Sequence, residues 1–305
     1  MTDRTAENAL PVGITGVGVA SDRHDTVDQL LLPDAPRRAD AADRLRRELG
    51  RGFRYKDQAT KLGVLAAIRA LSTAAHDQQP DTGIVVSSNF GNLQTVCDAA
   101  RLIRTEGVAA TSPMDLPNAS SNVIASTIAI HLGLRGPNLT VCNGAPAGLD
   151  ALRWAMLLIR ARRARRVVVV GVESATEAAA ALQSCAPSEL FEGAAAVVVE
   201  PLVRETAAVV VRHCGRGTDE KDAVTKALAA AADPPVDLWL GTQIGSAGTV
   251  LDVETYLGRA SGALGVLQCA VAAQWLGTGG RTAVAVAGGD DEGAAATVLT
   301  HAEPS

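Results

Sequence analysis

The sequence predicts an α/β layered fold built from two similar halves. Short β-branched runs alternate with longer segments rich in Ala and Leu, which is the order expected of alternating strands and helices. Hydrophobic residues make up 47% of the 305 residues, whereas aromatic residues make up only 3%. Such an aliphatic composition suits buried strands covered by helices. Several short segments also occur twice in the same order, which indicates an internal duplication.

Most elements of the first half follow from β-branched runs and from apolar residues at helical spacing. The segment RVVVVGVES, residues 166–174, is the most strand-like. One helix is expected to end at Gly107 and another before Gly136 and Pro137, because these residues interrupt helices. The charge-dense segment 34–57 predicts a surface helix with a loop. In chain order, the sequence predicts a strand over 11–20, a helix over 60–76, a strand over 82–89, helices over 95–107 and 119–134, a strand over 138–142, a helix over 149–164, and strands over 166–174 and 192–201.

The second half repeats the first. EGAAAVVVE at Glu192–Glu200 recurs as EGAAATVL at Glu292–Leu299. Three further pairs occur in matching places: RVVVVGV with RTAVAVAG, GAPAGLDAL with GRASGALGVL, and IVVSSNFGN with LWLGTQIGS. The sequence therefore predicts an N-terminal half over 1–203 and a C-terminal half over 204–305, the second with shortened loops.

Charge and composition argue against several classes of protein. A formal net charge of −5 carries no signature of nucleic-acid binding. The N-terminus lacks the pattern of a signal peptide, and no apolar run is long enough to span a bilayer, so a cytoplasmic location is expected. The Gly-rich segments do not match nucleotide-binding motifs. The following residues are too scattered for a disulfide framework or a metal site: Cys97, Cys142, Cys185, Cys214, Cys269, His24, His76, His131, His213 and His301. We therefore expect no metal, membrane or nucleic-acid partner.

The segment TVCNGAPAGLDAL, residues 140–152, predicts a strand end, a sharp turn and a helix start. Many α/β enzymes hold a nucleophile at such a turn. Here the turn contains Asn143, Gly144, Ala145 and Pro146, none of which carries a thiol or an activated hydroxyl. We interpret Pro146 as the first residue of the helix, where its missing N–H costs little.

The order of these motifs resembles that of the thiolase-fold β-ketoacyl synthases of fatty-acid and polyketide assembly. TSPMDLPNASSNVIASTIAIHLGLRGPNLTV, residues 111–141, is similar to the family segment that precedes the active-site turn. ARRVVVVGVES and EGAAAVVVEP are similar to the two family strands that follow, and GRASGALG is similar to the Gly-His motif of the second half. The resemblance implies a thiolase-like layered αβαβα fold with an abbreviated second half.

The family's condensation chemistry uses a Cys at a helix N-terminus and two His residues. The Cys attacks an acyl thioester, and the His residues stabilise the enolate formed by decarboxylation. The matching positions in this chain are Ala145, Leu240 and Arg259. Ala and Leu have no donor or acceptor in their side chains, and a guanidinium is no general base near neutral pH. The resemblance therefore implies that the condensation activity has been lost.

GLDAL at Gly148–Leu152 resembles the type II polyketide branch, in which an active ketosynthase pairs with an inactive homologue, the chain length factor. This resemblance implies a heterodimer that shapes the acyl tunnel. The chain then needs no cofactor of its own, because an acyl carrier protein brings the phosphopantetheine. Many chain length factors carry Gln at the Cys position, so Ala145 argues against decarboxylation of malonyl groups.

The resemblance also implies surfaces. Leu93, Val96 and Ala100 share a helix face and are expected to line the tunnel, although ordinary core packing is the alternative. The expected dimer interface consists of Asn122, Val123, Asn138, Leu139, Thr140 and Val141. The expected carrier-protein docking residues are Arg160, Arg162, Arg163, Arg165 and Arg166. The alternative is that these arginines are ordinary solvated charges at the end of a helix.

Alternatives remain open from the sequence. Arg259 is either an ion-pairing or phosphate-binding residue, or a solvated side chain in a shortened loop. Cys142 is either a relocated nucleophile or a small packing residue. In the first case the protein is an acyltransferase or hydrolase. A third possibility is a homodimeric scaffold or ligand-binding protein.

Overall fold

A single sheet of ten strands runs through the part of the chain that the structure describes. This computed structural model describes residues 10–31, 36, 41–74, 81–113, 116–202, 209–245, 247–289 and 292–301. His76 and the expected boundary between the halves at 203–204 lie outside these residues. The strands are β1 Val12–Ser21, β2 Thr82–Ser87, β3 Asn138–Val141, β4 Arg166–Glu173, β5 Gly193–Pro201, β6 Val209–Gly217, β7 Leu238–Leu240, β8 Thr249–Leu251, β9 Thr282–Gly289 and β10 Gly293–His301.

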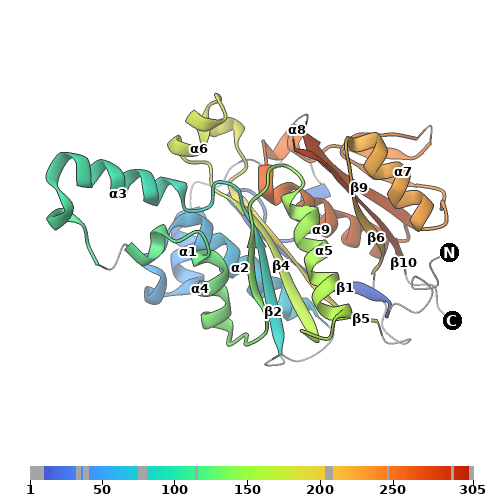
Figure 1. Ribbon diagram of the computed structural model, residues 1–305, viewed down its shortest axis with the longest axis horizontal. Coiled ribbons are helices and arrows are strands. Elements are labelled where there is room, and N and C mark those ends of the chain that lie inside the picture. Colours follow the sequence, from blue (N-terminus) through green and yellow to red (C-terminus); the bar gives the residue numbers. More distant parts are fainter. Residues whose placement is uncertain are drawn as a thin grey trace.

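The helices lie on both faces of this sheet (Figure 1). The α-helices are α1 Ala41–Leu49, α2 Gln58–Thr73, α3 Leu93–Glu106, α4 Val123–Leu132, α5 Ala147–Arg160, α6 Glu177–Leu182, α7 Glu220–Ala230, α8 Glu254–Leu257 and α9 Leu264–Gly277. The short 3-10 helices are η1 Asp28–Leu31, η2 Arg51–Phe53, η3 Val108–Ala110, η4 Leu116–Ala119, η5 Pro187–Glu189 and η6 Ser261–Ala263.

The strand order reveals the duplication. The sheet runs β3-β2-β4-β5-β1-β6-β10-β9-β7-β8. Counted from the outer edge inward, the strands of each half follow the same order: the third, second, fourth, fifth and first strand of that half. The strand directions match as well. In the first half β4 is parallel to β2 and antiparallel to β5, and in the second half β9 is parallel to β7 and antiparallel to β10. The halves meet where β1 pairs with β6 at Gly13 and Ile14. The repeats found in the sequence thus occupy equivalent elements, while the exact boundary stays a prediction.

Alternating side chains divide the described interior into three large hydrophobic cores, and a small fourth cluster forms around Ala179, Ala180 and Leu190. Along β4, Val167 and Val169 enter one core while Val168 and Val170 enter another, because successive side chains point to opposite faces of a sheet. α2 and α4 cover the second of these cores, and α7 covers a third on the C-terminal half. α5 and α9 fill the first core, between the two halves of the sheet. These layers confirm the predicted thiolase-like αβαβα fold.

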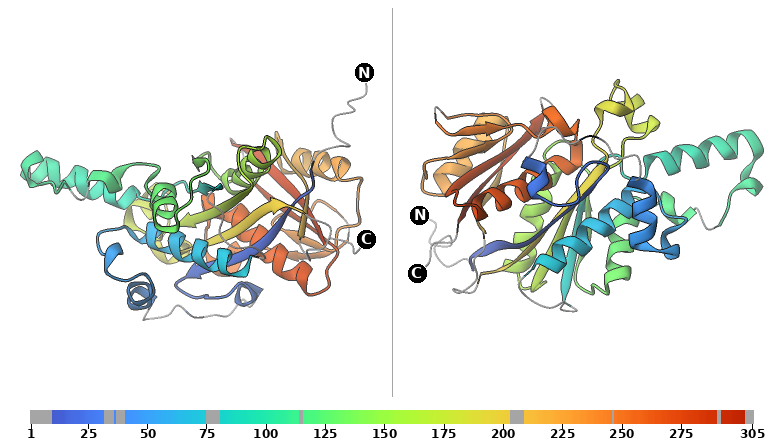
Figure 2. Two further views of the ribbon diagram at one scale, coloured as in Figure 1. Left: turned by 90° about the horizontal axis from the view of Figure 1, so that it is seen from below. Right: turned by 180° about the vertical axis from the view of Figure 1, so that it is seen from behind.

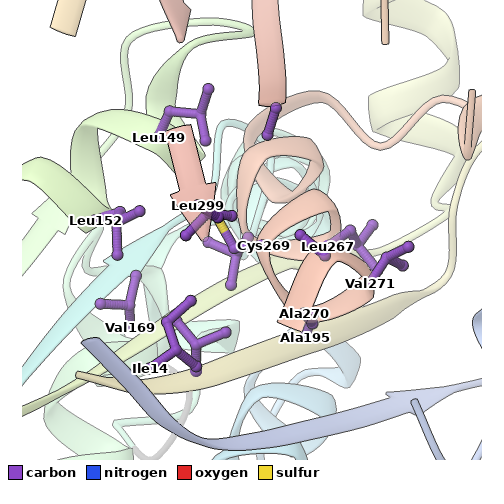
Figure 3. Close-up of a cluster of buried hydrophobic side chains, with 14 of the residues drawn as sticks. Ile14, Leu149, Leu152, Val169, Ala195, Leu267, Cys269, Ala270, Val271 and Leu299 are labelled. Carbon is purple, nitrogen blue, oxygen red and sulfur yellow. The ribbon is translucent and has the colours of Figure 1, made fainter. Parts of the chain in front are cut away.

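The central core depends on a close approach of α5 and α9. Figure 3 shows Leu149 and Leu152 of α5 in the same cluster as Leu267 of α9. A Cβ atom on Gly148 would lie 2.7 Å from the backbone nitrogen of Gly265, so the two helices can cross at this distance only through glycine. This contact fixes where α5 begins, and therefore where the turn before it lies.

Several helix boundaries differ from the sequence prediction: α2 and α3 each begin two residues earlier than predicted, and α5 ends at Arg160 rather than at 164. α4 begins at Val123 and ends at Leu132, because Gly133 takes the left-handed conformation, with φ 68°, before Gly136 and Pro137 are reached. α5 begins at Ala147, and Pro146 is its N-cap residue rather than its first helical residue. The predicted end of α3 at Gly107 and the surface helix within 34–57 are both confirmed.

α3 projects from the rest of the molecule, as both Figure 1 and Figure 2 show. None of its residues is buried. Among the described residues, no helix combines the length and the apolar character needed to cross a membrane.

Candidate functional site at an empty nucleophile turn

The turn between β3 and α5 has the backbone of a nucleophile turn. Gly144 adopts φ 85°, which favours glycine, and the chain then enters α5. The Ala145 N–H lies at the helix N-terminus, where the helix dipole favours negative charge. It donates a hydrogen bond of 2.7 Å to the carboxylate oxygen Oε2 of Glu292. The position that could bind an anion is therefore occupied by a side chain of the C-terminal half, 147 residues away in sequence.

Several contacts hold Glu292 at this turn. The missing side chain of Gly144 makes room for it, because any Cβ there would collide with the Glu292 carboxylate. Arg216 of β6 donates from Nη2 to the Glu292 backbone oxygen at 2.9 Å, and its Nη1 lies 3.5 Å from Asp150 Oδ2. Asp150 in turn accepts a hydrogen bond of 2.7 Å from Asn143 Nδ2. The turn and the β9–β10 connection therefore form one polar network.

Asn89, just after β2, clamps the turn from the other side. Its Nδ2 donates to the Gly144 oxygen at 2.9 Å and to Ser261 Oγ at 2.8 Å. Its Oδ1 accepts the Gly144 N–H at 3.2 Å. One amide side chain therefore links β2, the turn and η6 of the C-terminal half.

Glu173 supports Asn89 from the end of β4. Its carboxylate is 3% exposed and accepts the backbone N–H groups of Asn89 at 2.6 Å, Phe90 at 3.1 Å and Gly262 at 3.2 Å. Burial raises the pKa of the Glu173 carboxyl to about 7, although the hydrogen bonds from Asn89 and Phe90 act to lower it. The sequence motif GVES contained this residue but did not reveal its contacts.

The comparisons with known proteins decide the family. The family described as "Beta-ketoacyl synthase, N-terminal domain" matches residues 17–188, which is more than half of the chain. The chain belongs to the β-ketoacyl synthase family. The 3-oxoacyl-[acyl-carrier-protein] synthase 2 of Rhizobium meliloti is 33% identical over 98 residues, which are 32% of this chain and 23% of that protein. The Vibrio cholerae synthase of the same name is 27% identical over 127 residues, 40% of this chain and 31% of that protein.

Solved structures share the fold of this ketosynthase-family chain. One described as the ishigamide ketosynthase/chain length factor has a TM-score of 0.80 at 22% identity and covers 96% of this chain and 100% of its own. Another, a type II polyketide synthase acyl-carrier protein in complex with its ketosynthase bound to the hexaketide, has a TM-score of 0.78 at 16% identity, with 96% and 99% covered. At these identities the likeness concerns the fold.

The two positions matched to the family His residues lie in different surroundings. Leu240 is fully buried at the end of β7, and its backbone oxygen accepts a hydrogen bond of 3.1 Å from Gln268 Nε2. Arg259 is exposed, and its Nη1 donates to the Gln183 oxygen at 3.4 Å, beside the end of α6. Among the described contacts, neither side chain joins the polar network of the turn. Of the two roles considered for Arg259, this contact favours a solvated side chain in a surface loop over an ion-pairing residue inside the site.

Cys142 is a poor candidate for a relocated nucleophile. Its thiol points to the backbone oxygen of Asn89 at 3.8 Å rather than to a base. Partial desolvation, and then the nearby Glu173 carboxylate, raise the pKa of the Cys142 thiol. A nucleophilic cysteine needs the opposite shift, because the thiolate is the reactive form.

The predicted arginine cluster requires one correction. Arg160, Arg162, Arg163 and Arg165 are exposed, but Arg166 is 2% exposed and pairs with Glu200 at 3.2 Å. The physical reason is that the helix ends before Arg166, which is the first residue of β4 and faces the interior of the sheet. Arg166 is therefore a structural residue and is unavailable for docking a carrier protein.

A second group of cations was not predicted from the sequence. Arg46, Arg51, Arg54 and Lys61 line a surface hollow beside Phe53 and Tyr55. Asn118 connects this hollow to the segment after β2, because its Nδ2 donates to the Tyr55 oxygen at 2.8 Å and its backbone oxygen accepts from Asn92 Nδ2 at 2.7 Å. Asn92 lies three residues after Asn89. The hollow is therefore at the same end of the sheet as the turn.

The expected interface residues divide into exposed and buried ones. β3 is an edge strand, paired only with β2 among the described residues, and Asn138 to Val141 are exposed or half-buried. Asn122 is exposed as well. Val123, by contrast, is 6% exposed and packs in the core beneath α4, so its side chain cannot reach a partner.

The α3 residues are not part of the core. Leu93 is half-buried, while Val96 and Ala100 are exposed. The alternative of core packing within this chain is therefore wrong. Val96 and Ile103 lie seven residues apart on one face of α3 and are 38% and 40% exposed, so they form an exposed apolar stripe on this helix. Val108, in η3 beyond the end of α3, is 71% exposed.

Proposed function

We propose that this chain is a noncatalytic ketosynthase-like subunit of the chain-length-factor kind, which pairs with an active ketosynthase in polyketide or polyene synthesis. The observation that carries the proposal is the turn itself. Its backbone is that of a nucleophile turn, its nucleophile position is Ala145, and the Ala145 N–H is bonded to Glu292 of the same chain. An alanine cannot accept an acyl group, and the carboxylate occupies the place where an acyl oxygen would bind.

The surfaces support a role as a partner. The open edge of β3 carries backbone groups that a second strand can satisfy. The Thr140 hydroxyl at this edge is buried and has no hydrogen-bond partner among the described residues. The apolar stripe on α3 is also left uncovered. Exposed edges and apolar stripes of this kind are typical of protein interfaces.

One face of α3 suits a role in limiting the length of the acyl chain that the complex makes. Leu93, Val96 and Ala100 share one face of a helix that lies outside the core of this chain. In a heterodimer their bulk would limit the space for the growing chain. The carrier protein would supply the phosphopantetheine, so this chain needs no cofactor of its own.

The proposal is tested by co-expression with ketosynthases, followed by size-exclusion chromatography with mass determination. We expect a one-to-one complex. A stable homodimer that binds no ketosynthase would contradict the proposal and favour a scaffold or ligand-binding protein.

The tunnel role is tested in the same complex. Ala100→Trp should shorten the product, because it fills space on the proposed tunnel face. Thr105→Trp, on the opposite face of α3, is the matched control and should leave the product unchanged. Equal product lengths in both variants would argue against the tunnel role.

A further inference from the structure

The two halves of the molecule differ in charge at one equivalent place. In the first half, a buried carboxylate of β5 lies between a cation of β4 and a hydroxyl of β1. Arg166 Nη2 lies 3.2 Å from Glu200 Oε2, and the Thr15 hydroxyl donates to Glu200 Oε1. Arg166 and Glu200 are only 2% and 8% exposed. In this half the carboxylate and the cation therefore satisfy each other inside the protein.

A β-bulge marks the same position in the first strand of each half. In β1 the pairing with β5 skips Thr15, and in β6 the pairing with β10 skips Arg212. A bulge leaves one residue without a direct cross-strand partner and re-aims its side chain. In the first half this side chain is the hydroxyl that reaches Glu200. Arg212 of the second half therefore takes the position that Thr15 takes in the first.

Two threonines replace the ion pair in the second half. Glu200 ends the repeat EGAAAVVVE, and Thr300 stands at the same place in the second copy. Thr300 pairs with Thr282 of β9 at the register where Glu200 lies opposite Arg166 of β4. Both threonines are buried, and Arg212 Nε donates to Thr300 Oγ1 at 2.8 Å. The second half thus has a cation at this place but lacks the carboxylate.

The place of the missing carboxylate is open to the surface. α7 covers the outer face of the second half, as α2 covers that of the first (Figure 1). However, α7 has 11 residues whereas α2 has 16. A hollow of about 570 Å³ lies beyond the end of α7, and Ala231 and Pro234 form part of its wall. Both threonines line this hollow as well. Its volume is in the range of small-molecule sites.

The charge of the hollow favours an anion. Its lining includes Arg212, Arg281 and His301, and no described lining residue carries a carboxylate. Asp237, beside the hollow, lies 3.5 Å from Arg281, but Arg281 is 79% exposed, so this ion pair is weak. No described residue bonds to the two terminal nitrogens of Arg212. The forked donors of a guanidinium match the two oxygens of a carboxylate.

We infer that this hollow binds the carboxylate of a small organic acid, in the place that Glu200 fills in the first half. The carboxylate would accept hydrogen bonds from Arg212 beside the two threonine hydroxyls, and it would link β6, β9 and β10. The hollow is at the end of the sheet away from the empty turn, because Thr282 begins β9 whereas Glu292, which bonds to the turn, follows the end of β9. The inference is therefore independent of the proposed pairing with a ketosynthase.

Calorimetric titration of the whole purified chain with succinate tests the site. We expect one succinate per chain and a rise in melting temperature, because a ligand that binds only the folded state stabilises it. Arg212→Gln should weaken binding at least tenfold, since it removes charged hydrogen bonds. Arg163→Gln, at an exposed arginine between α5 and β4, makes the same change of charge elsewhere and should keep the dissociation constant within twofold.

Thr300→Glu is a second variant that tests the comparison between the halves. It places a carboxylate on β10 where β5 has Glu200, so it should abolish succinate binding and raise the melting temperature without ligand. If this variant does not fold, Arg212→Gln still decides the question. Absence of binding at millimolar succinate, or equal losses in Arg212→Gln and Arg163→Gln, would overturn the inference. Tighter binding of inorganic phosphate, or of a tetraglutamate peptide, would also overturn the assignment to a small organic acid.

Discussion

At the scale of single residues, the turn before α5 carries alanine at its centre, and the N–H of this alanine is already bonded to a carboxylate of the same chain. Glu292 reaches across from the C-terminal half and bonds to the N–H of Ala145, and Gly144 leaves the space that it needs. Restoring a cysteine alone would therefore place a thiol beside a carboxylate. A neighbouring negative charge disfavours the thiolate.

This argument predicts how a restored cysteine behaves. In a Cys142→Ser background, Ala145→Cys should react slowly with iodoacetamide at pH 7. Adding Glu292→Gln should increase the rate about tenfold, because removal of one adjacent charge lowers the thiol pKa by roughly one unit. The rate is followed by mass spectrometry. Equal rates with and without Glu292→Gln would show that the carboxylate does not control the turn.

Glu173 predicts a pH dependence of stability. Its folded-state pKa of about 7 lies above the ordinary glutamate pKa of 4.5, so the folded state holds the proton more tightly. The stabilisation is therefore complete below about pH 4.5 and is lost as the pH rises through about 7. Across this window the free energy of unfolding should fall by about 3 kcal/mol.

Urea denaturation at pH 5 and pH 8 tests this prediction. Glu173→Gln should remove the fall in the free energy of unfolding between these pH values. Glu106→Gln, at an exposed position at the end of α3, should retain this fall. Glu173→Gln should also be less stable at both pH values, because its amide nitrogen would face the N–H groups of Asn89 and Phe90. A variant with the same pH dependence as the unaltered chain would refute this role for Glu173.

At the scale of elements, the two edges of the sheet allow a direct test of pairing. In β3 the residues on either side of Thr140 bond to β2, as the hydrogen bond of 3.1 Å from Ser88 N–H to the Val141 oxygen shows. The Thr140 N–H therefore points to the open edge. In β8, the Thr249 N–H donates to the Asp237 oxygen, so Val250 faces the other open edge in the same way.

Thr140→Pro should consequently weaken the complex with a ketosynthase at least tenfold, because it removes a donor from the edge without breaking the bonds to β2. Val250→Pro makes the equivalent change at the opposite edge and should leave the affinity unchanged. Sedimentation or calorimetric titration gives both dissociation constants. Equal affinities in the two variants would mean that β3 is not the pairing edge.

Local patterns in the sequence predicted the elements that carry a continuous β-branched run or apolar residues at helical spacing. The fully buried valines of β4 are such a run, and α2 and α5 have apolar residues at helical spacing. The prediction omitted β6 and α7, although a β-branched run and an Asp N-cap before an Ala-rich helix mark them locally. It could not reveal the projection of α3, because this depends on how the elements pack. It also misplaced Arg166, since a run of arginines does not show where a helix ends and a strand begins.

The site was predictable only in part for the same reason. The empty turn was visible because its residues are contiguous. The contacts of Ala145 with Glu292 and of Asn89 with Glu173 join distant segments, so no local pattern marks them. The two carboxylates become candidates for the site only after the fold places them beside the turn.

At the scale of the whole molecule, the two halves are joined by one sheet and one core. They share a continuous sheet through β1 and β6, and they share the core that contains α5 and α9. Trp154 lies in the first half, and Trp239 and Trp275 lie in the second. Unfolding should therefore be a single transition whether it is followed by Trp154 or by the other two tryptophans.

The contact between α5 and α9 provides the sharpest test of this unity. A Cβ on Gly265 would lie 2.5 Å from the Leu149 nitrogen, so Gly265→Ala must push the helices apart and should destabilise the protein by about 1–3 kcal/mol. Gly277→Ala, at the end of the same helix, meets nothing within 4 Å and should change stability little. Thermal unfolding of single-tryptophan variants should show both halves losing stability together in Gly265→Ala. If only the C-terminal half melted earlier, the shared core would not couple the halves, and the position of the empty turn would be set by the N-terminal half alone.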